Sequence, residues 1–213
     1  MSANKIILSY HDALIRQSDY KILCSKEWIN DNLLEFWFEY LQKELFKNHE
    51  ENLFCIGPSL SQLIKLTTNI DEIGGILSSL DLQSKQLILL SINDSYLFES
   101  AGGSHWSLLV FNAKSSKFEH YDSSFNSCNI HHAEKVAWKL NQLFFPTKQS
   151  LNIEKMYCNQ QEDSYNCGIH VICNAEGVCK KYFCNDSRPL SDIVSPASIR
   201  LTRDRLKQLI DDL

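Results

Sequence analysis

The chain has 213 residues, of which 44% are hydrophobic and 22% are charged, and its formal net charge is -5. This length suits one folded domain with a sizeable core, and the acidic balance argues against a general nucleic-acid-binding protein. Because no apolar run is long enough to cross a membrane and the first residues lack the apolar core of a signal peptide, we expect a cytosolic or nuclear protein.

The N-terminal half of the chain is predicted to be mainly helical. After a short strand over 5–9, apolar residues recur at helical spacing over 27–48 and predict a long amphipathic helix. Proline suits the first turn of a helix, so Pro58 predicts a second helix over 58–66. A third helix is expected over 71–80, weakened by two glycines.

The middle of the chain is predicted to form strands. Residues 85–92 are almost continuously apolar, which is typical of a buried strand. A loop over 93–103 follows. Two further strands are expected over 105–111 and 117–122, and the short polar link 112–116 indicates that they pair as a hairpin.

The C-terminal part alternates again between helix and strand. We expect a helix over 131–145 that is stopped by Pro146, a weak strand over 151–157, a helix that begins at Cys167, and a last helix over 196–213. Helices that flank a central sheet containing an antiparallel hairpin indicate the α+β class.

Cys167 lies where a polar loop meets an apolar helix. The unpaired N–H groups and the positive end of a helix favour a thiolate over a thiol, so this is a suitable position for a nucleophile. Gly168 leaves the backbone beside the sulfur open to an approaching carbonyl group. Apolar residues from Ile169 to Tyr182 are predicted to line one broad face. The alternative is that Cys167 is one more small buried residue.

The predicted hairpin supplies partners for this thiol. His105 begins one strand and Asp122 ends the next, so folding brings them opposite each other or one register step apart. A thiol protease needs a thiol, an imidazole that deprotonates it, and a group that orients the imidazole. Gln161 could donate to the oxyanion that forms on attack, together with the backbone N–H of Cys167.

Other assignments remain open for each of these residues. His105, Asp122 and Gln161 could be a structural histidine, a turn carboxylate and a surface glutamine. Four further histidines are candidate bases, namely His120, His131, His132 and His170. His170 is the strongest of them because it lies three residues beyond the thiol. We prefer His105, since a base on a strand can meet the sulfur from across a cleft.

Eight cysteines need an explanation, and none of them forms a C-x-x-C pair of the kind that structural zinc sites usually show. Without a secretory signal, disulfides are not expected. We interpret most of them as free thiols and expect no metal and no other cofactor. The eight are Cys24, Cys55, Cys128, Cys158, Cys167, Cys173, Cys179 and Cys184.

The segments GGSHWSLLVF, HYDS and QEDSYNCG together resemble the Ulp/sentrin-specific cysteine proteases, which cleave ubiquitin-like modifiers after a C-terminal Gly-Gly. The segment WIND at 28–31 resembles a Trp-Leu-Asn-Asp motif of the same family. The similarity runs over nearly the whole chain and is greatest with the compact deneddylase branch, which acts on the neddylation modifier. Two positions depart from the family: Asn166 stands where Asp is common, and His170 where an aromatic residue is common.

The resemblance implies a papain-like fold of the Ulp type. A mostly antiparallel sheet is flanked by helices, and the nucleophile lies at a helix N-terminus. Residues 1–213 would form a single protease domain whose two lobes meet at the active-site cleft. His105, Asp122 and Cys167 would be the catalytic triad, and Gln161 the oxyanion donor.

The resemblance also implies how a substrate is held. Trp28 and Trp106 would cover a narrow tunnel for the Gly-Gly tail, since flat indole faces suit a segment without side chains. Asp31 would contact the basic surface of the modifier, and the loop 93–103 could close over the tail. The implied partners are the neddylation modifier and its conjugates, such as cullins, bound by a monomer. No nucleic acid and no membrane are expected.

Four functions are therefore compared. The first is an isopeptidase that matures the neddylation modifier and removes it from target lysines. The second is the same chemistry on SUMO, the third a module that binds a modifier without cleaving it, and the fourth acyl transfer. The compact chain without a long N-terminal extension favours the first. The full set of Cys, His, Asp and Gln argues against the third, because pure binding needs no nucleophile.

Overall fold

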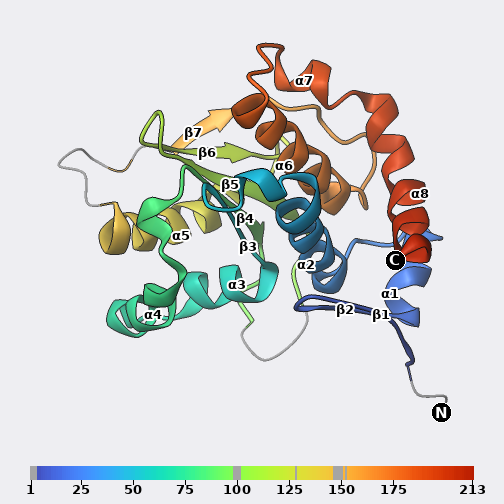
Figure 1. Cartoon of the computed structure of the whole chain (residues 1–213), viewed down its shortest axis with the longest axis horizontal. Coiled ribbons are helices and arrows are strands. Elements are labelled where there is room, and N and C mark those ends of the chain that lie inside the picture. The colour runs from blue at the N-terminus through green and yellow to red at the C-terminus, as the bar shows by residue number, and fades with distance from the viewer. Residues whose placement is uncertain (1–3, 98–101, 128, 146–150, 152) are drawn as a thin grey trace.

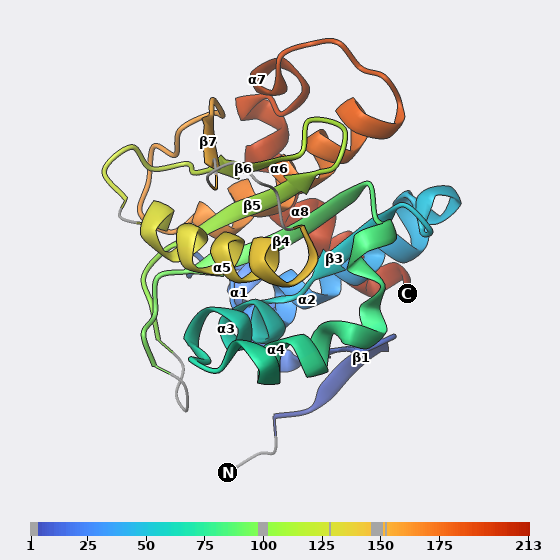
Figure 2. The ribbon, with the colours of Figure 1, turned by 90° about the vertical axis from the view of Figure 1, so that its left-hand side faces the viewer.

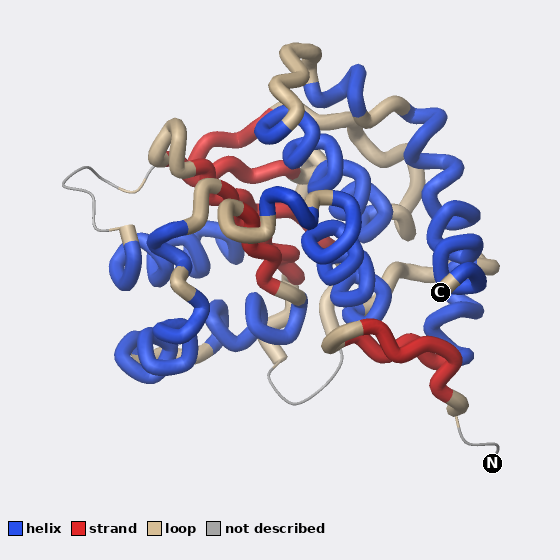
Figure 3. Tube along the Cα trace, in the orientation of Figure 1, coloured by secondary structure: helices blue, strands red, loops and turns tan. Residues whose placement is uncertain are grey.

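The computed structural model describes residues 4–97, 102–127, 129–145, 151 and 153–213. Its centre is a five-stranded sheet in which the strands follow one another in chain order, and Figure 3 shows it as a red band through the molecule. The strands are β3 (Leu53–Ile56), β4 (Leu87–Asn93), β5 (Trp106–Asn112), β6 (Lys117–Tyr121) and β7 (Ile153–Met156).

The sheet is mixed, whereas we predicted a mostly antiparallel one. The pairs β4–β5 and β5–β6 are antiparallel, and the pairs β3–β4 and β6–β7 are parallel. Parallel neighbours need a crossover connection, and helices provide it here between β3 and β4 and between β6 and β7. The predicted hairpin is β5–β6.

Helices cover both faces of the sheet (Figures 1 and 2), which confirms the α+β class. One face carries α2 (Asp31–Tyr40), α6 (Cys167–Phe183) and α8 (Pro196–Asp212). The other face carries α3 (Pro58–Leu66), α4 (Ile70–Leu77) and α5 (Asn129–Phe144). Smaller elements are the hairpin β1 (Ile6–Tyr10) with β2 (Ala13–Arg16), and the helices α1 (Gln17–Leu23) and α7 (Leu190–Ile193). None of the helices in the described ranges is long and apolar enough to span a bilayer.

The helix α6 is the central element of one of the two cores. Residues 167–179 are buried without interruption, including the polar His170, Asn174 and Glu176, so this part of the helix is enclosed on all sides and not on one broad apolar face as predicted. The reason is its position between the strand β5, the helix α2 and the helix α8. A helix enclosed in this way offers its first residue a fixed position.

Most predicted elements are present with shifted ends. The helix at 58–66 is confirmed to the residue. The long amphipathic helix begins at Asp31, not at residue 27, because the side chain of Asn30 accepts a hydrogen bond from the N–H of Leu33 (3.2 Å) and caps it there. It continues as a π-helix over Leu41–Leu45. Pro146, which we expected to stop the α5 helix, lies outside the described residues.

Candidate active site

Cys167 is the first residue of α6 and is only 1% exposed. The loop before it is held by Asp163, whose carboxylate accepts hydrogen bonds from the backbone N–H groups of Tyr165 (3.0 Å) and Asn166 (2.8 Å). The glycine that follows the thiol is required by packing: a Cβ at Gly168 would lie 2.6 Å from the Cβ of Ile29. The start of α6 is thereby pressed against the segment that carries Trp28.

His105 and Asp122 form a direct hydrogen-bonded pair. The distance from Nε2 of His105 to Oδ1 of Asp122 is 2.7 Å, and the two side chains are 12% and 15% exposed. The strand register places Asp122 opposite Ser107, two residues from His105, whereas we expected an offset of at most one. Diagonal neighbours two residues apart share a face of the sheet and stay within reach of long side chains.

The surroundings of His105 favour its charged form. Burial lowers the pKa of the imidazole, but hydrogen bonds and charge interactions with Asp122 and Cys167 outweigh burial and raise it to about 9. Burial raises the pKa of Asp122, yet hydrogen bonds from His105 and from the N–H of Ser124 bring it below its ordinary value. Near neutral pH the site therefore holds an imidazolium between a carboxylate and a sulfur atom.

The other candidate bases have different partners. His120 is buried and shares a hydrogen bond with Oγ of Ser107 (2.8 Å). His170, the main rival, is 4% exposed. Burial lowers the pKa of both imidazoles to about 4, which leaves them neutral. His131 is exposed and pairs with a glutamate on its own helix.

Gln161 is fixed by hydrogen bonds on both sides of its amide. Its Nε2 donates to the carbonyl of Asp163 (2.7 Å), and its Oε1 accepts from Oγ of Ser123 (2.8 Å). An amide NH₂ group has two hydrogens, so one remains for another acceptor. Its role as an oxyanion donor stays a prediction.

A cleft of about 860 Å³ lies beside the thiol. Residues predicted to bind substrate gather around it, and its lining includes Trp28, Asp31, His105, Trp106 and Cys167. Trp28 is 48% exposed, and Trp106 is 8% exposed. Their indole N–H groups donate to the carbonyls of Ser164 (2.7 Å) and Ile29 (3.0 Å), which fixes both rings. Asp122 and Gln161 do not line the cleft.

Asp94 is a site residue that the sequence reasoning missed. Its carboxylate accepts hydrogen bonds from the N–H of Ser104 (2.6 Å), the hydroxyl of Ser104 (2.7 Å) and the N–H of His105 (3.1 Å). It thereby closes the base of the loop that precedes β5. An Asn-Asp-Ser run after a buried strand is a known turn signal, but the sequence does not show that its carboxylate binds the backbone of His105.

The helix α3 supports the same loop from the other side. Lys65 is buried, and its ammonium donates to the carbonyls of Asn93 and Ser95; burial lowers its pKa to about 8. Gln62 donates to the carbonyls of Ser95 (3.2 Å) and Leu97 (3.1 Å). Among the described residues, no three His, Cys, Asp or Glu side chains are grouped to hold a metal ion.

Known proteins resemble this chain in sequence and in fold. A family model described as "Ulp1 protease family, C-terminal catalytic domain" matches residues 27–192. The human sentrin-specific protease 8 (Homo sapiens) is 38% identical over 208 residues, which cover 98% of this chain and 97% of the relative. The NEDD8-specific protease 1 of Arabidopsis thaliana is 30% identical over 181 residues, covering 82% and 75%.

A solved structure shares the fold at low sequence identity. The X-ray structure of the C-terminal Ulp1 protease domain in complex with Smt3, the yeast ortholog of SUMO, matches with a TM-score of 0.71. The identity is 18%, and the match covers 100% of this chain and 90% of that one. This likeness establishes the fold alone.

Proposed function

The chain belongs to the Ulp1 protease family, and from this premise we propose that it is a cysteine protease that cleaves after the C-terminal Gly-Gly of NEDD8. It would act both on the NEDD8 precursor and on the isopeptide bond that joins NEDD8 to target lysines. The observation that carries the chemistry is the His105–Asp122 pair, 2.7 Å apart, facing a thiol at a helix N-terminus.

The first half of the reaction transfers the modifier to the enzyme. The sulfur of Cys167 attacks the carbonyl carbon of the last glycine, and the carbonyl oxygen becomes an oxyanion. The backbone N–H of Cys167 and the free amide hydrogen of Gln161 stabilise it. As the C–N bond breaks, the imidazolium of His105 gives its proton to the departing amine, and a thioester remains.

The second half releases the modifier. His105, now neutral, takes a proton from a water molecule that attacks the thioester carbonyl. The C–S bond breaks, the modifier leaves with a free carboxylate, and the thiolate pairs again with the imidazolium. Throughout the reaction Asp122 stays hydrogen-bonded to Nε2 of the His105 ring. The other ring nitrogen, Nδ1, is therefore the one that faces the sulfur.

The substrate proposal rests on the relatives and on the shape of the site. Sentrin-specific protease 8 of human and mouse is 38% identical over at least 96% of this chain, and NEDD8-specific protease 1 of Arabidopsis thaliana is 30% identical over 82% of it. A cleft bordered by the indoles of Trp28 and Trp106 suits a tail of two glycines, because flat indole faces can pack against a segment without side chains. Cullins as targets, a monomeric enzyme and a cytosolic or nuclear location are parts of the same proposal.

The test uses modifiers that carry an electrophile in place of the C-terminal carboxylate. NEDD8 with a C-terminal propargylamide should form a covalent adduct with the protein, and peptide mapping should place it on Cys167. SUMO and ubiquitin with the same group are the matched probes. An adduct with SUMO and none with NEDD8 would show that SUMO, and not NEDD8, is the substrate. If none of the three probes formed an adduct, the proposed function would be wrong.

A further inference from the structure

Arg203, on the helix α8, contacts the active-site loop although no residue of α8 lines the cleft. Its Nε donates to Oδ1 of Asn166 (3.0 Å), directly before the nucleophile. Its Nη1 donates to the carbonyl of Ile22 (2.8 Å), and its Nη2 to the carbonyl of Glu27 (2.6 Å). One side chain thus binds two segments: the nucleophile loop (residues 161–166) and the tryptophan segment (residues 22–30).

The geometry suits an arginine and no other residue. A guanidinium presents five donors in a rigid planar fork, so it can bind groups on different sides at once, whereas an ammonium is a compact point charge. Burial lowers the pKa of Arg203, while Tyr165, Asp163 and Cys167 act in the opposite direction. Its guanidinium also lies over the ring of Tyr165, 5.5 Å from the centroid.

The hydrogen bonds continue from Arg203 toward the proposed oxyanion donor. Asn166 accepts from Arg203 with its Oδ1 and donates from its Nδ2 to Oδ2 of Asp163 (2.7 Å). The carbonyl of Asp163 in turn accepts from Nε2 of Gln161. The amide of Asn166 can serve both neighbours because it has an acceptor and a donor, whereas an aspartate there would face the carboxylate of Asp163.

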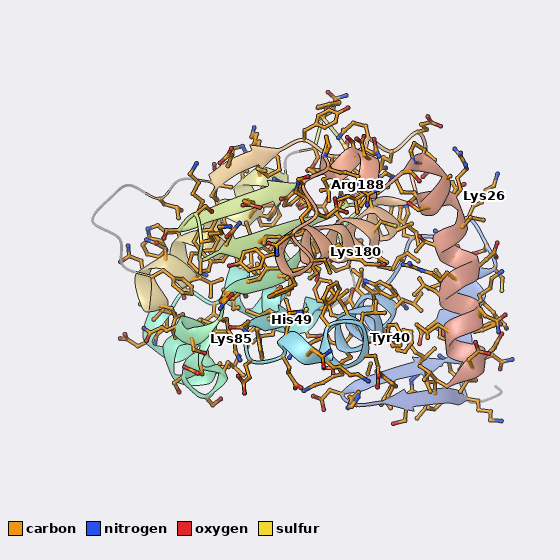
Figure 4. All side chains as sticks on the ribbon, turned by 45° about the horizontal axis from the view of Figure 1, so that its top comes forward. Lys26, Tyr40, His49, Lys85, Lys180 and Arg188 are labelled. Atoms are coloured by element: carbon orange, nitrogen blue, oxygen red, sulfur yellow. The ribbon has the colours of Figure 1, made fainter. Side chains whose placement is uncertain are left out.

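The two segments are also joined on the cleft side. The indole N–H of Trp28 donates to the carbonyl of Ser164, so the tryptophan segment is bound to the nucleophile loop both at the cleft and at α8. Figure 1 shows α1 next to α8, and in Figure 4 the labelled Lys26, between α1 and α2, lies close to α8. Arg203 occupies the junction of these elements.

We infer that Arg203 is a positioning residue, which holds the nucleophile loop and the tryptophan segment in the relative placement that hydrolysis needs. Through Asn166 and Asp163 it also fixes Gln161. The inference rests on the proposed function, since it assigns a role in that reaction. A displacement of about 1 Å at a reacting group can lower a rate about 10²-fold, so a modest loosening has a measurable effect.

The first experiment compares Arg203→Lys with Arg200→Ala, an exposed arginine on the same helix. Turnover of NEDD8 with a C-terminal fluorogenic amide is measured per active site, counted by titration with NEDD8 propargylamide, so that unfolded protein does not contribute. Arg203→Lys should lower kcat about 10²-fold with KM changed less than threefold, and Arg200→Ala should behave as the wild type. Equal kcat per active site in both variants would overturn the inference.

The second experiment exchanges Asp163 and Asn166, which lie between Arg203 and Gln161 in the chain of hydrogen bonds. Asn166→Asp alone places two carboxylates side by side and should lower kcat. The double variant Asp163→Asn with Asn166→Asp restores one amide and one carboxylate and should recover most of kcat. If the kcat of the double variant is no higher than that of Asn166→Asp, this chain of hydrogen bonds does not position Gln161.

These outcomes are distinct from a failure of the proposed function. If wild-type protein neither reacts with NEDD8 propargylamide nor hydrolyses the fluorogenic substrate, the proposed function fails, and the inference fails with it. If the wild type does both and the Arg203 and Asn166 variants match it, only the positioning role is wrong.

Discussion

Three buried or nearly buried histidines show how neighbouring groups decide the charge of a side chain. His120 and His170 lose water without gaining an anionic hydrogen-bond partner, and burial lowers the pKa of both to about 4. His105 is enclosed too, but a carboxylate and a sulfur atom contact it, and its pKa rises to about 9. Of these three, His105 alone is in the state that can donate a proton to a leaving amine near neutral pH.

The variant Asp122→Asn should move the alkaline limit of activity to lower pH. Wild-type kcat/KM is expected to fall as the pH rises through about 9, where His105 loses its proton. Asparagine keeps an acceptor but removes the charge that raises the pKa, so the fall should begin nearer the ordinary value of 6.5. The measurement is a pH profile with a fluorogenic NEDD8 amide. An alkaline limit that does not move would show that Asp122 leaves the imidazole unaffected.

Cys167→Ser should abolish turnover while NEDD8 still binds, because an alcohol is a far weaker nucleophile and the cleft is unchanged. The control is Cys173→Ser on the same helix, where the thiol contacts Oγ1 of Thr202 (3.1 Å) and a hydroxyl can replace it. Binding is measured by calorimetry and turnover by the fluorogenic assay. Activity of more than a few per cent in Cys167→Ser would place the nucleophile elsewhere.

Gln161→Ala should lower kcat about 10²–10³-fold with little change in KM, because an oxyanion donor acts only as charge develops. Single-turnover kinetics at saturating substrate measure the chemical step directly. The matched control is Ser123→Ala, which removes only the hydroxyl that donates to the amide oxygen of Gln161 and should have a smaller effect. A defect in KM alone would assign Gln161 to binding.

At the scale of elements, the loop between β4 and β5 determines how His105 is presented. Asp94 accepts three hydrogen bonds at the base of this loop, and Lys65 and Gln62 on α3 hold its first residues. Gly103 has a φ of +87°, which a residue with a side chain adopts at a cost, and a Cβ there would lie 2.1 Å from Oδ1 of Asn93. The backbone at residues 103–105 is therefore held close to Asn93 and Asp94.

Asp94→Ala should lower kcat/KM about tenfold or more, because the backbone of His105 loses its anchor. Asp94→Asn keeps the acceptor oxygen for the N–H groups of Ser104 and His105 and should retain most of the activity. The comparison of the two variants in the fluorogenic assay, with thermal unfolding measured in parallel, separates the hydrogen bonds from the charge. Equal losses in both would mean that the charge and not the anchoring matters.

The sequence predicted elements well where a local signal marks an end. Pro58 defines the start of α3, and the short polar link 112–116 defines the hairpin β5–β6. The short strand β3 was missed, since four residues carry too little periodicity. The resemblance and the spacing together selected His105, Asp122 and Cys167. Asp94 and Arg203 were missed because they contact groups that are distant in sequence, and no local sequence pattern indicates such contacts.

At the scale of the whole molecule, a cluster of acidic side chains around Glu35 reaches the cleft at Asp31. Burial, together with the charges of Glu39, Asp12 and Asp31, raises the pKa of Glu35 to about 7. Asp31 lines the cleft itself. Carboxylates this close to one another disfavour ionisation of one of them, and a positively charged partner would relieve the repulsion.

The KM for NEDD8 should accordingly rise with ionic strength, and Asp31→Asn should raise it with little effect on kcat. Interactions between exposed charges are screened over about 8–10 Å at 0.1–0.15 M salt. The control is Glu72→Gln on α4, an exposed carboxylate at the opposite face of the sheet. If salt leaves KM unchanged, or if both variants raise it equally, the acidic border does not select the modifier.

The hairpin that pairs His105 with Asp122 has a consequence for the order of folding. These two residues are 17 positions apart, so bringing them together costs little loop-closure entropy, and hairpins form in about 1–10 μs. The thiol arrives later, because Cys167 comes from a distant part of the chain and meets β5 only when α6 docks. We therefore expect that in partly folded chains His105 is already paired with Asp122, while Cys167 does not yet contact His105. An immature molecule of this protease would then be unable to cleave its neighbours.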